Sequence, residues 1–225
     1  MLRTRFLCAR LTSQRRFATS AYGGTPGDGT LGLAQLDYIP LQATLRDGTP
    51  VEVGPFRQDE WPIGMDLMNL IIREGRTWPF DHEFATLDAY RGYFLSHTAL
   101  VVRSESQFLG CCYIKPNFPG RCSHVCNGGF LTQPHCRGRG VATLMGHVFL
   151  RVAKDLGYRS AYFNLVFASN PVSIRLWENL GFERVAVLEK AADLKGVPGL
   201  DTAYGYRFDL DALKDGSLDD MVIVK

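Results

Sequence analysis

Acidic residues are absent from this 225-residue chain before Asp28. The same stretch holds five arginines among serine, threonine, leucine, phenylalanine and alanine, namely Arg3, Arg5, Arg10, Arg15 and Arg16. An acid-free, arginine-rich start is typical of a mitochondrial transit peptide, so we expect one over residues 1–17 and a mature protein in the matrix. The alternative is a basic tail that binds an acidic partner, but the order Arg16-Phe17-Ala18 favours processing.

An excess of positive charge is lacking once that segment is set aside. Without its five arginines, the 25 basic residues fall to 20 against 23 acidic ones, a net charge of about −3. Proteins that hold nucleic acid carry a basic surface, so no nucleic-acid partner is expected. Long apolar runs are lacking too, and no membrane span is expected.

Cysteine is scarce, with six residues in the chain. Three of them lie near two histidines, in the order Cys122, His124, Cys126, His135 and Cys136, and zinc prefers these residue types. The spacing provides no tight knuckle, because Cys122 and Cys126 fall largely within an expected strand. Disulfides are disfavoured in a reducing matrix. Buried thiols and no metal are therefore expected.

The chain between its ends alternates strand and helix patterns. We expect a flexible connector rich in Gly, Thr and Pro over residues 18–36, one domain over 37–212 and a tail over 213–225. The expected strands are residues 41–45, 51–57, 98–103, 108–115, 127–134, 160–167, 183–188 and 204–210, and the expected helices are 58–75, 86–95, 141–156 and 171–180. This order predicts an α/β or α+β fold with a mixed sheet.

The stretch 127–182 has the features of one binding device. The turn Arg137-Gly-Arg-Gly140 separates an apolar strand from an amphipathic helix. The first amides of a helix have no intrahelical acceptor, so this turn predicts an anion site. Asn170 and Pro171 then provide a cap and a first-turn proline for the next helix.

The order Arg137-x-x-Gly140-x-Ala142, followed by Val166-x-x-x-Asn170, Ser173 and Leu180-Gly-Phe182, resembles the GNAT superfamily of acyl-CoA-dependent N-acetyltransferases. The resemblance implies a central mixed, mostly antiparallel sheet with splayed parallel central strands and flanking helices. It also implies acetyl-CoA as co-substrate, with pantetheine between the splayed strands and pyrophosphate at the helix start. The implied cofactor-binding residues are Phe130, Leu131, Thr132, Arg137, Gly138, Arg139, Gly140, Val141, Ala142, Asn170 and Ser173.

A further set of motifs resembles the fungal azetidine-2-carboxylate N-acetyltransferases, mitochondrial enzymes of proline metabolism. The motifs are Tyr113-Ile-Lys-Pro-Asn117, Arg121-Cys-Ser-His124, Cys126-Asn127, Gly129-Phe-Leu131 and Phe163-Asn-Leu-Val-Phe167. This resemblance implies acetylation of small cyclic imino acids, including cis-4-hydroxyproline, with the pyrroline-carboxylate/glutamate-semialdehyde pair as a further acceptor, and it suggests a homodimer. It makes Asn127 and Asn164 the catalytic candidates. Asn127 would hold the acceptor carboxylate with its side-chain amide, and the backbone of Asn164 and Leu165 would bond the same group.

Direct transfer needs an aligned thioester, oxyanion stabilisation and a base or water chain that removes the amine proton. Trp177 stands where many members of the superfamily carry a tyrosine that protonates the thiolate, so proton return falls to water or another group. Two alternatives stay open. One is an acetyltransferase for another small amine or a protein amino terminus, and the other is a catalytically silent acyl-CoA-binding module.

Overall fold

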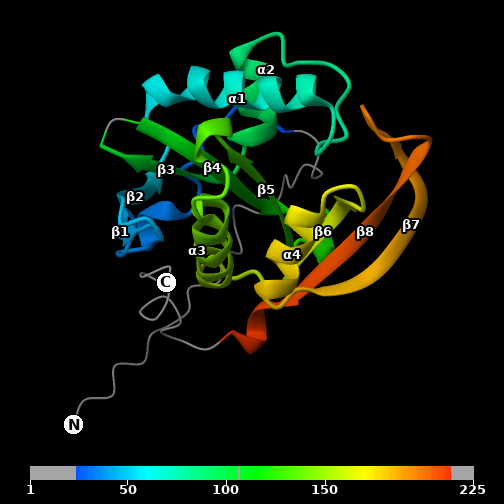
Figure 1. Ribbon diagram of the computed structural model, residues 1–225. Coiled ribbons are helices and arrows are strands. Elements are labelled where there is room, and N and C mark those ends of the chain that lie inside the picture. Colours follow the sequence, from blue (N-terminus) through cyan, green and yellow to red (C-terminus); the bar gives the residue numbers. More distant parts are fainter. Residues whose placement is uncertain (1–23, 106, 214–225) are drawn as a thin grey trace.

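The computed structural model describes residues 24–105 and 107–213. The strands are β1 (Leu41–Thr44), β2 (Pro50–Pro55), β3 (Thr98–Ser104), β4 (Gln107–Pro116), β5 (Val125–Thr132), β6 (Ser160–Phe167), β7 (Glu183–Asp193) and β8 (Leu200–Asp209), and the helices are α1 (Trp61–Glu74), α2 (Leu87–Phe94), α3 (Val141–Asp155) and α4 (Pro171–Asn179). One sheet contains all these strands in the order β1-β2-β3-β4-β5-β6-β8-β7 (Figure 1). Only β5 and β6 pair in parallel, which confirms the mixed, mostly antiparallel sheet.

Helices cover both faces of the sheet. α1 and α2 lie on one side, and α3 and α4 lie on the other (Figure 1). The apolar stripe of α3 buries Met145, Val148 and Phe149 completely, as its helical spacing predicts. On the opposite face, Tyr90 and Phe94 of α2 are fully buried. The sheet therefore separates two cores, and a ligand that enters between its strands meets a different layer on each side.

The parallel strands β5 and β6 separate after two residue pairs. Their pairing is limited to Val125 with Ser160 and Cys126 with Ala161. Beyond this point, aromatic rings from both strands pack on the α3 side, with 5.8 Å between the ring centres of Phe130 and Phe163. The expected splay is confirmed, and it leaves the facing backbone groups of both strands without strand partners.

The hairpin of β7 and β8 is longer than the sequence predicts. The patterns indicate strands over 183–188 and 204–210, whereas β7 extends to Asp193 and β8 begins at Leu200. Pairing shifts between Leu188 and Ala192, and Lys190 adopts φ 53° within the irregular segment. A bulge of this kind interrupts the two-residue alternation on which the prediction depends, so the strand continues where its pattern stops.

The described part of the expected connector packs on the domain. The amide of Gly29 donates to the carbonyl of Leu95 at 2.9 Å, and Ala99 returns a bond to Gly29 at 2.8 Å. Leu33 and Leu36 are buried in the core. Burial of these two leucines explains why residues 24–36 differ from the flexible connector expected there, since the content of Gly, Thr and Pro does not reveal which apolar side chains are buried. The expected transit segment 1–17 and residues 214–225 lie outside the described residues.

No helix within residues 24–105 and 107–213 combines the length and the apolar content that a bilayer span requires.

Candidate active site

The glycine-rich turn forms an open anion site at the start of α3. Gly138 and Gly140 have φ values of 82° and 90°, a region that side chains other than glycine rarely adopt. The first helical bond joins the amide of Leu144 to the carbonyl of Gly140 at 3.0 Å. The amides of Val141 and Ala142 therefore have no acceptor within the helix, and the helix dipole adds partial positive charge there. The predicted phosphate site has the geometry that an anion needs.

The two arginines of this turn are paired with carboxylates. Arg137 donates to both oxygens of Glu74, at 2.9 and 3.0 Å. Arg139 donates to Asp47 at 2.7 Å and to Thr49 at 2.9 Å. Hydrogen bonds from Thr49 and the Arg139 guanidinium lower the pKa of Asp47 to about 2. Solvent-exposed pairs of this type contribute little to stability, so a diphosphate can take the place of either carboxylate.

The other predicted cofactor residues lie along the gap and at the next helix start. Phe130, Leu131 and Thr132 belong to the part of β5 that has left β6, and strand alternation directs the backbone groups of Phe130 and Thr132 to the gap and those of Leu131 to β4. Asn170 caps α4, because its side-chain oxygen accepts from the amide of Ser173 at 3.2 Å. The predicted residues thus lie on the free part of β5 and at the starts of α3 and α4, and the structure shows the capping role of Asn170 directly.

Asn127 follows the last pair of β5 with β6. Its side chain is 8% exposed, and its Oδ1 accepts a hydrogen bond from the amide of Gly128 at 2.8 Å. With the oxygen held in this way, the Nδ2 group is directed elsewhere as a donor. Lys115 is the cross-strand partner of Asn127 on β4, so both side chains project on the α1/α2 face.

Asn164 is held by a residue that the sequence did not single out. Its side-chain amide exchanges two hydrogen bonds with that of Asn117, at 2.9 and 2.7 Å. The pairing of β6 with β8 shifts between Phe163 and Val166, so Asn164 and Leu165 have no register partner on β8. Their backbone also lies beyond the last pair with β5. The Asn164 side chain therefore fixes the strand at the point where the backbone of Asn164 and Leu165 has no register partner on β5 or β8.

Aromatic side chains close the α1/α2 side of β5. A Cβ on Gly129 would overlap the rings of Trp78 and Tyr113, so glycine is required for these rings to lie against the strand. Trp78 belongs to the connection between α1 and α2, which also contains Phe80. Sequence reasoning did not count Trp78 among the site residues, because buried aromatics are most often core. The sequence signal that could have indicated Trp78 is the glycine pair Gly128-Gly129 in β5, because a glycine in a strand allows a large side chain to lie against the backbone.

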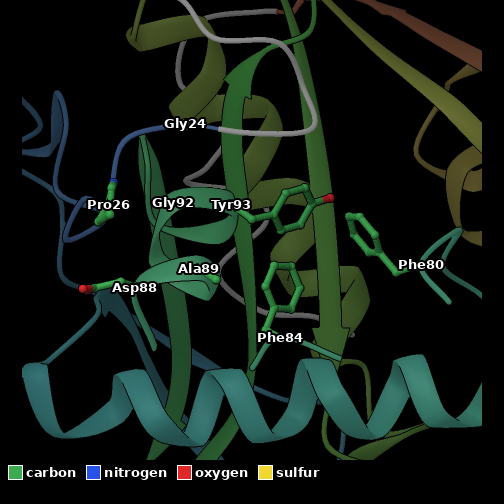
Figure 2. A pocket seen from close by; sticks show the side chains of 8 residues that line it. All are labelled: Gly24, Pro26, Phe80, Phe84, Asp88, Ala89, Gly92 and Tyr93. Carbon is green, nitrogen blue, oxygen red and sulfur yellow. The ribbon is translucent and has the colours of Figure 1, made fainter. Parts of the chain in front are cut away.

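A cavity of about 390 Å³ lies beside α2 (Figure 2). The rings of Phe80, Phe84 and Tyr93 line it, and Asp88 stands at its other end. Gly24, Pro26, Ala89 and Gly92 complete the lining. Its volume suits a small molecule, and Tyr93 connects it to the buried Lys115, as described next.

Lys115 carries a buried amine that no carboxylate among the described residues pairs with. Its side chain is 1% exposed, and its Nζ donates to the carbonyl of Tyr93 at 2.8 Å. The ammonium lies 3.9 Å from the ring centre of Tyr93 and 4.3 Å from that of Tyr113. No ion pair involves Lys115 among residues 24–105 and 107–213. Burial lowers the pKa of Lys115 to about 7.

The cysteines do not assemble a metal site. No group of three or more possible ligands occurs in the part of the chain that the structure describes. Cys126 and Cys136 are buried, as expected, but Cys122 is exposed. Cys122 ends a 3-10 turn, Gly120–Cys122, outside β5, so its expected place in a strand is wrong. Gly120 and Pro119 account for the difference, because they turn the chain before the strand begins.

The chain matches a protein-family model. Residues 65–182, which include most of α1, the splayed strands and the glycine-rich turn, match the model described as the acetyltransferase (GNAT) family.

Two curated relatives share substantial identity. The N-acetyltransferase aca1 of Schizosaccharomyces pombe is 39% identical over 165 residues, which cover 66% of this chain and 79% of the relative. Protein SPT10 of Saccharomyces cerevisiae is 36% identical over 123 residues, which cover 52% of this chain and only 19% of SPT10.

Solved structures share the fold at lower identity. A GCN5-related N-acetyltransferase from Kribbella flavida aligns with a TM-score of 0.67 and 24% identity, covering 71% of this chain and 97% of its own. YncA of Salmonella typhimurium, solved with its cofactor acetyl-CoA, aligns with a TM-score of 0.64 and 16% identity over 74% of this chain and 98% of its own. Both likenesses concern the fold.

Proposed function

This chain belongs to the GNAT family of acetyltransferases, and from that membership we propose that it acetylates the nitrogen of a small cyclic imino acid. The family identifies an acyltransferase that uses acetyl-CoA as co-substrate. The acceptor class is our inference, and azetidine-2-carboxylate and cis-4-hydroxyproline are the substrates that we propose. The pyrroline-carboxylate/glutamate-semialdehyde pair has the same combination of nitrogen and carboxylate.

One observation supports this acceptor above the others. Asn127 on β5 and the strand-free backbone of Asn164 and Leu165 on β6 lie beyond the last pair of the two strands, on either side of the gap. A carboxylate between them can accept from both strands without a formal positive charge. A zwitterionic imino acid suits such a site, because an uncharged amide attracts the carboxylate but does not repel the nitrogen.

The reaction itself needs little covalent chemistry from the protein. Pantetheine fits in the gap, where backbone groups of Phe130 and Thr132 are free of β6, and the diphosphate fits on the amides after Gly140. A backbone amide of β5 aimed at the thioester oxygen stabilises the oxyanion that forms on attack. Alignment of the nitrogen with the thioester then accounts for most of the acceleration.

Self-association and a matrix location are part of the same proposal. β7 forms an edge of the sheet, and Val185, Val187 and Leu188 on it are 50–61% exposed. An exposed apolar edge strand favours pairing with a second copy. Sedimentation equilibrium should give a dimer, and a monomer at micromolar concentration would contradict it.

The acceptor proposal is tested by thiol release from acetyl-CoA with a panel of amines. The panel contains azetidine-2-carboxylate, cis-4-hydroxyproline, proline, a polyamine and a peptide, together with azetidine as the matched amine without a carboxylate. Turnover of the imino acids well above azetidine is expected. Preference for the polyamine or the peptide would favour the other acetyltransferase reading, and cofactor binding without turnover would favour a silent acyl-CoA-binding module.

A further inference from the structure

We propose that Lys115 is the general base of the acetyl transfer and takes a proton from the acceptor nitrogen, directly or through one water molecule. The inference rests on the family's acetyl transfer to an amine and not on which amine is used. The reaction requires a group that removes a proton from the acceptor amine, and none of the other residues described above provides one. An acceptor amine with a pKa near 10 costs about 4 kcal/mol to deprotonate at neutral pH.

The position of Lys115 is the first argument. It is the cross-strand partner of Asn127, the residue at which β5 leaves β6. Side chains that face each other across antiparallel strands have Cβ atoms about 4.5–5.5 Å apart. Tyr113, two residues away on the same face, lies against Gly129 of β5. The Lys115 side chain therefore lies on the α1/α2 face, beside the segment of β5 that borders the gap.

Its isolation is the second argument. A buried lysine that serves structure alone is normally paired with a carboxylate. Lys115 instead has one acceptor, the carbonyl of Tyr93, and two aromatic rings. A neutral amine can donate one N–H to that carbonyl and still keep its lone pair for a proton.

The groups that face Nζ set its protonation. Tyr93 comes from α2, Tyr113 from β4, the uncharged Asn127 from β5, and His97 from the turn before β3. Burial, and then the charge of Lys115, lower the pKa of His97 to about 4, so this histidine is neutral at pH 7. The rings and the carbonyl favour the ammonium, but burial dominates and places the pKa of Lys115 at about 7, where a general base is effective.

The acceptor ammonium gives one proton to the neutral Lys115 amine, and the freed lone pair forms the C–N bond with the thioester carbon. The C–S bond then breaks, and the second nitrogen proton goes to the departing thiolate, giving the amide and the free thiol. Lys115 finally releases its proton to solvent, so one proton is produced per turnover.

A purely structural role makes a different prediction. Tyr93 lies in the last turn of α2, where carbonyls have no intrahelical donor, and a lysine there can serve as a cap. Arginine would keep this cap, the charge and the contact with the rings, but a guanidinium does not give up its proton. Lys115→Arg therefore separates the base from the cap.

The experiment measures kcat between pH 5.5 and 9.5 for the wild type, Lys115→Arg and Lys115→Met, with the best acceptor of the panel above. The wild type should show a rising limb with a midpoint near pH 7. Both variants should lose that limb and at least about 100-fold in kcat, the usual contribution of a general base. Calorimetry should give acetyl-CoA affinities within twofold of the wild type.

Lys154→Met is the matched control. Lys154 of α3 also donates to a backbone carbonyl, that of Leu213, on the other side of the sheet. Its loss should change the melting temperature and leave the pH profile unaltered. A Lys115→Arg enzyme with a normal profile would overturn the proposal in favour of the cap, and a limb that persists in both Lys115 variants would assign the base elsewhere.

A measurement on the wild type does not depend on any variant or acceptor. Lysine labelled with ¹³C at Cε reports the protonation of each side chain by NMR. One resonance should titrate near pH 7, well below the usual lysine value of about 10.4. If every lysine titrates above pH 9, Lys115 is a cation at working pH and cannot be the base. A failure of azetidine-2-carboxylate as acceptor would instead affect only the proposed substrate.

Discussion

The side-chain amides of Asn117 and Asn164 form a closed pair, with each amide donating to the oxygen of the other at 2.9 and 2.7 Å. The pair joins the segment after β4 to the irregular part of β6. It therefore positions the backbone that we assign to the acceptor carboxylate.

Removal of either side-chain amide should leave the other one without its two hydrogen bonds. Asn117 is 4% exposed, so Asn117→Ala should lower the free energy of unfolding by about 1–3 kcal/mol. The double variant with Asn164→Ala should cost less than the sum of the two single changes, since the second loss removes a group that has already lost its partner. Urea unfolding of the four proteins measures this coupling. Strictly additive losses would show that the pair is energetically independent.

The phosphate turn should depend on the absence of a side chain at Gly140. Gly140→Trp fills the path to the amides of α3, so acetyl-CoA binding should fall below detection by calorimetry. Because Gly140 has a positive φ, any side chain there also destabilises the fold by about 1–2 kcal/mol. Gly120→Trp is the control, since it places the same side chain at another glycine with a positive φ. Gly120 has φ 58° and open space around its Cβ, away from the turn. Normal binding by the Gly140 variant would mean that the diphosphate lies elsewhere.

The buried lysine should also make stability depend on pH. Between pH 7 and 10.5, the unfolded state holds a proton on Lys115 that the folded state has lost, so unfolding becomes harder as pH rises. The free energy of unfolding of the wild type relative to Lys115→Met should therefore increase from pH 7 to 9.5, by at most about 1.4 kcal/mol per pH unit. Denaturant unfolding at four pH values measures the difference. A difference that stays constant would indicate an ordinary lysine pKa.

Processing in mitochondria is a prediction from the first residues. The arginine-rich, acid-free segment and the order Arg16-Phe17-Ala18 indicate import followed by cleavage. Protein purified from the matrix should begin within a few residues of Ala18 on amino-terminal sequencing. A matrix protein that still begins at Met1 would refute the cleavage.

Local patterns in the sequence predict most of the fold and the anion site. The spacing of Met145, Val148 and Phe149 predicts the buried face of α3, and Gly140 predicts its open start, because both signals come from neighbouring residues. The Asn117–Asn164 pair depends on a contact between residues 47 positions apart, which no local pattern contains. The isolation of Lys115 is likewise a property of what packs around it.

The sequence predictions for the length of β7 and for the segment 24–36 were wrong for related reasons. The bulge near Lys190 breaks the alternation that marks a strand, and Leu33 and Leu36 follow a segment rich in glycine, threonine and proline that suggests flexibility. In both cases pairing or burial with distant residues outweighs the local preference.

The central claim is that Asn127 holds the acceptor carboxylate, and one comparison tests it directly. The kcat/KM for azetidine-2-carboxylate and for azetidine is measured with the wild type and with Asn127→Ala, with a melting curve for each protein. We expect the variant to lose about 1–3 kcal/mol of transition-state stabilisation with azetidine-2-carboxylate, the range for leaving a charged partner unmet, and almost none with azetidine. Equal losses with the two amines would contradict the role that we assign to Asn127.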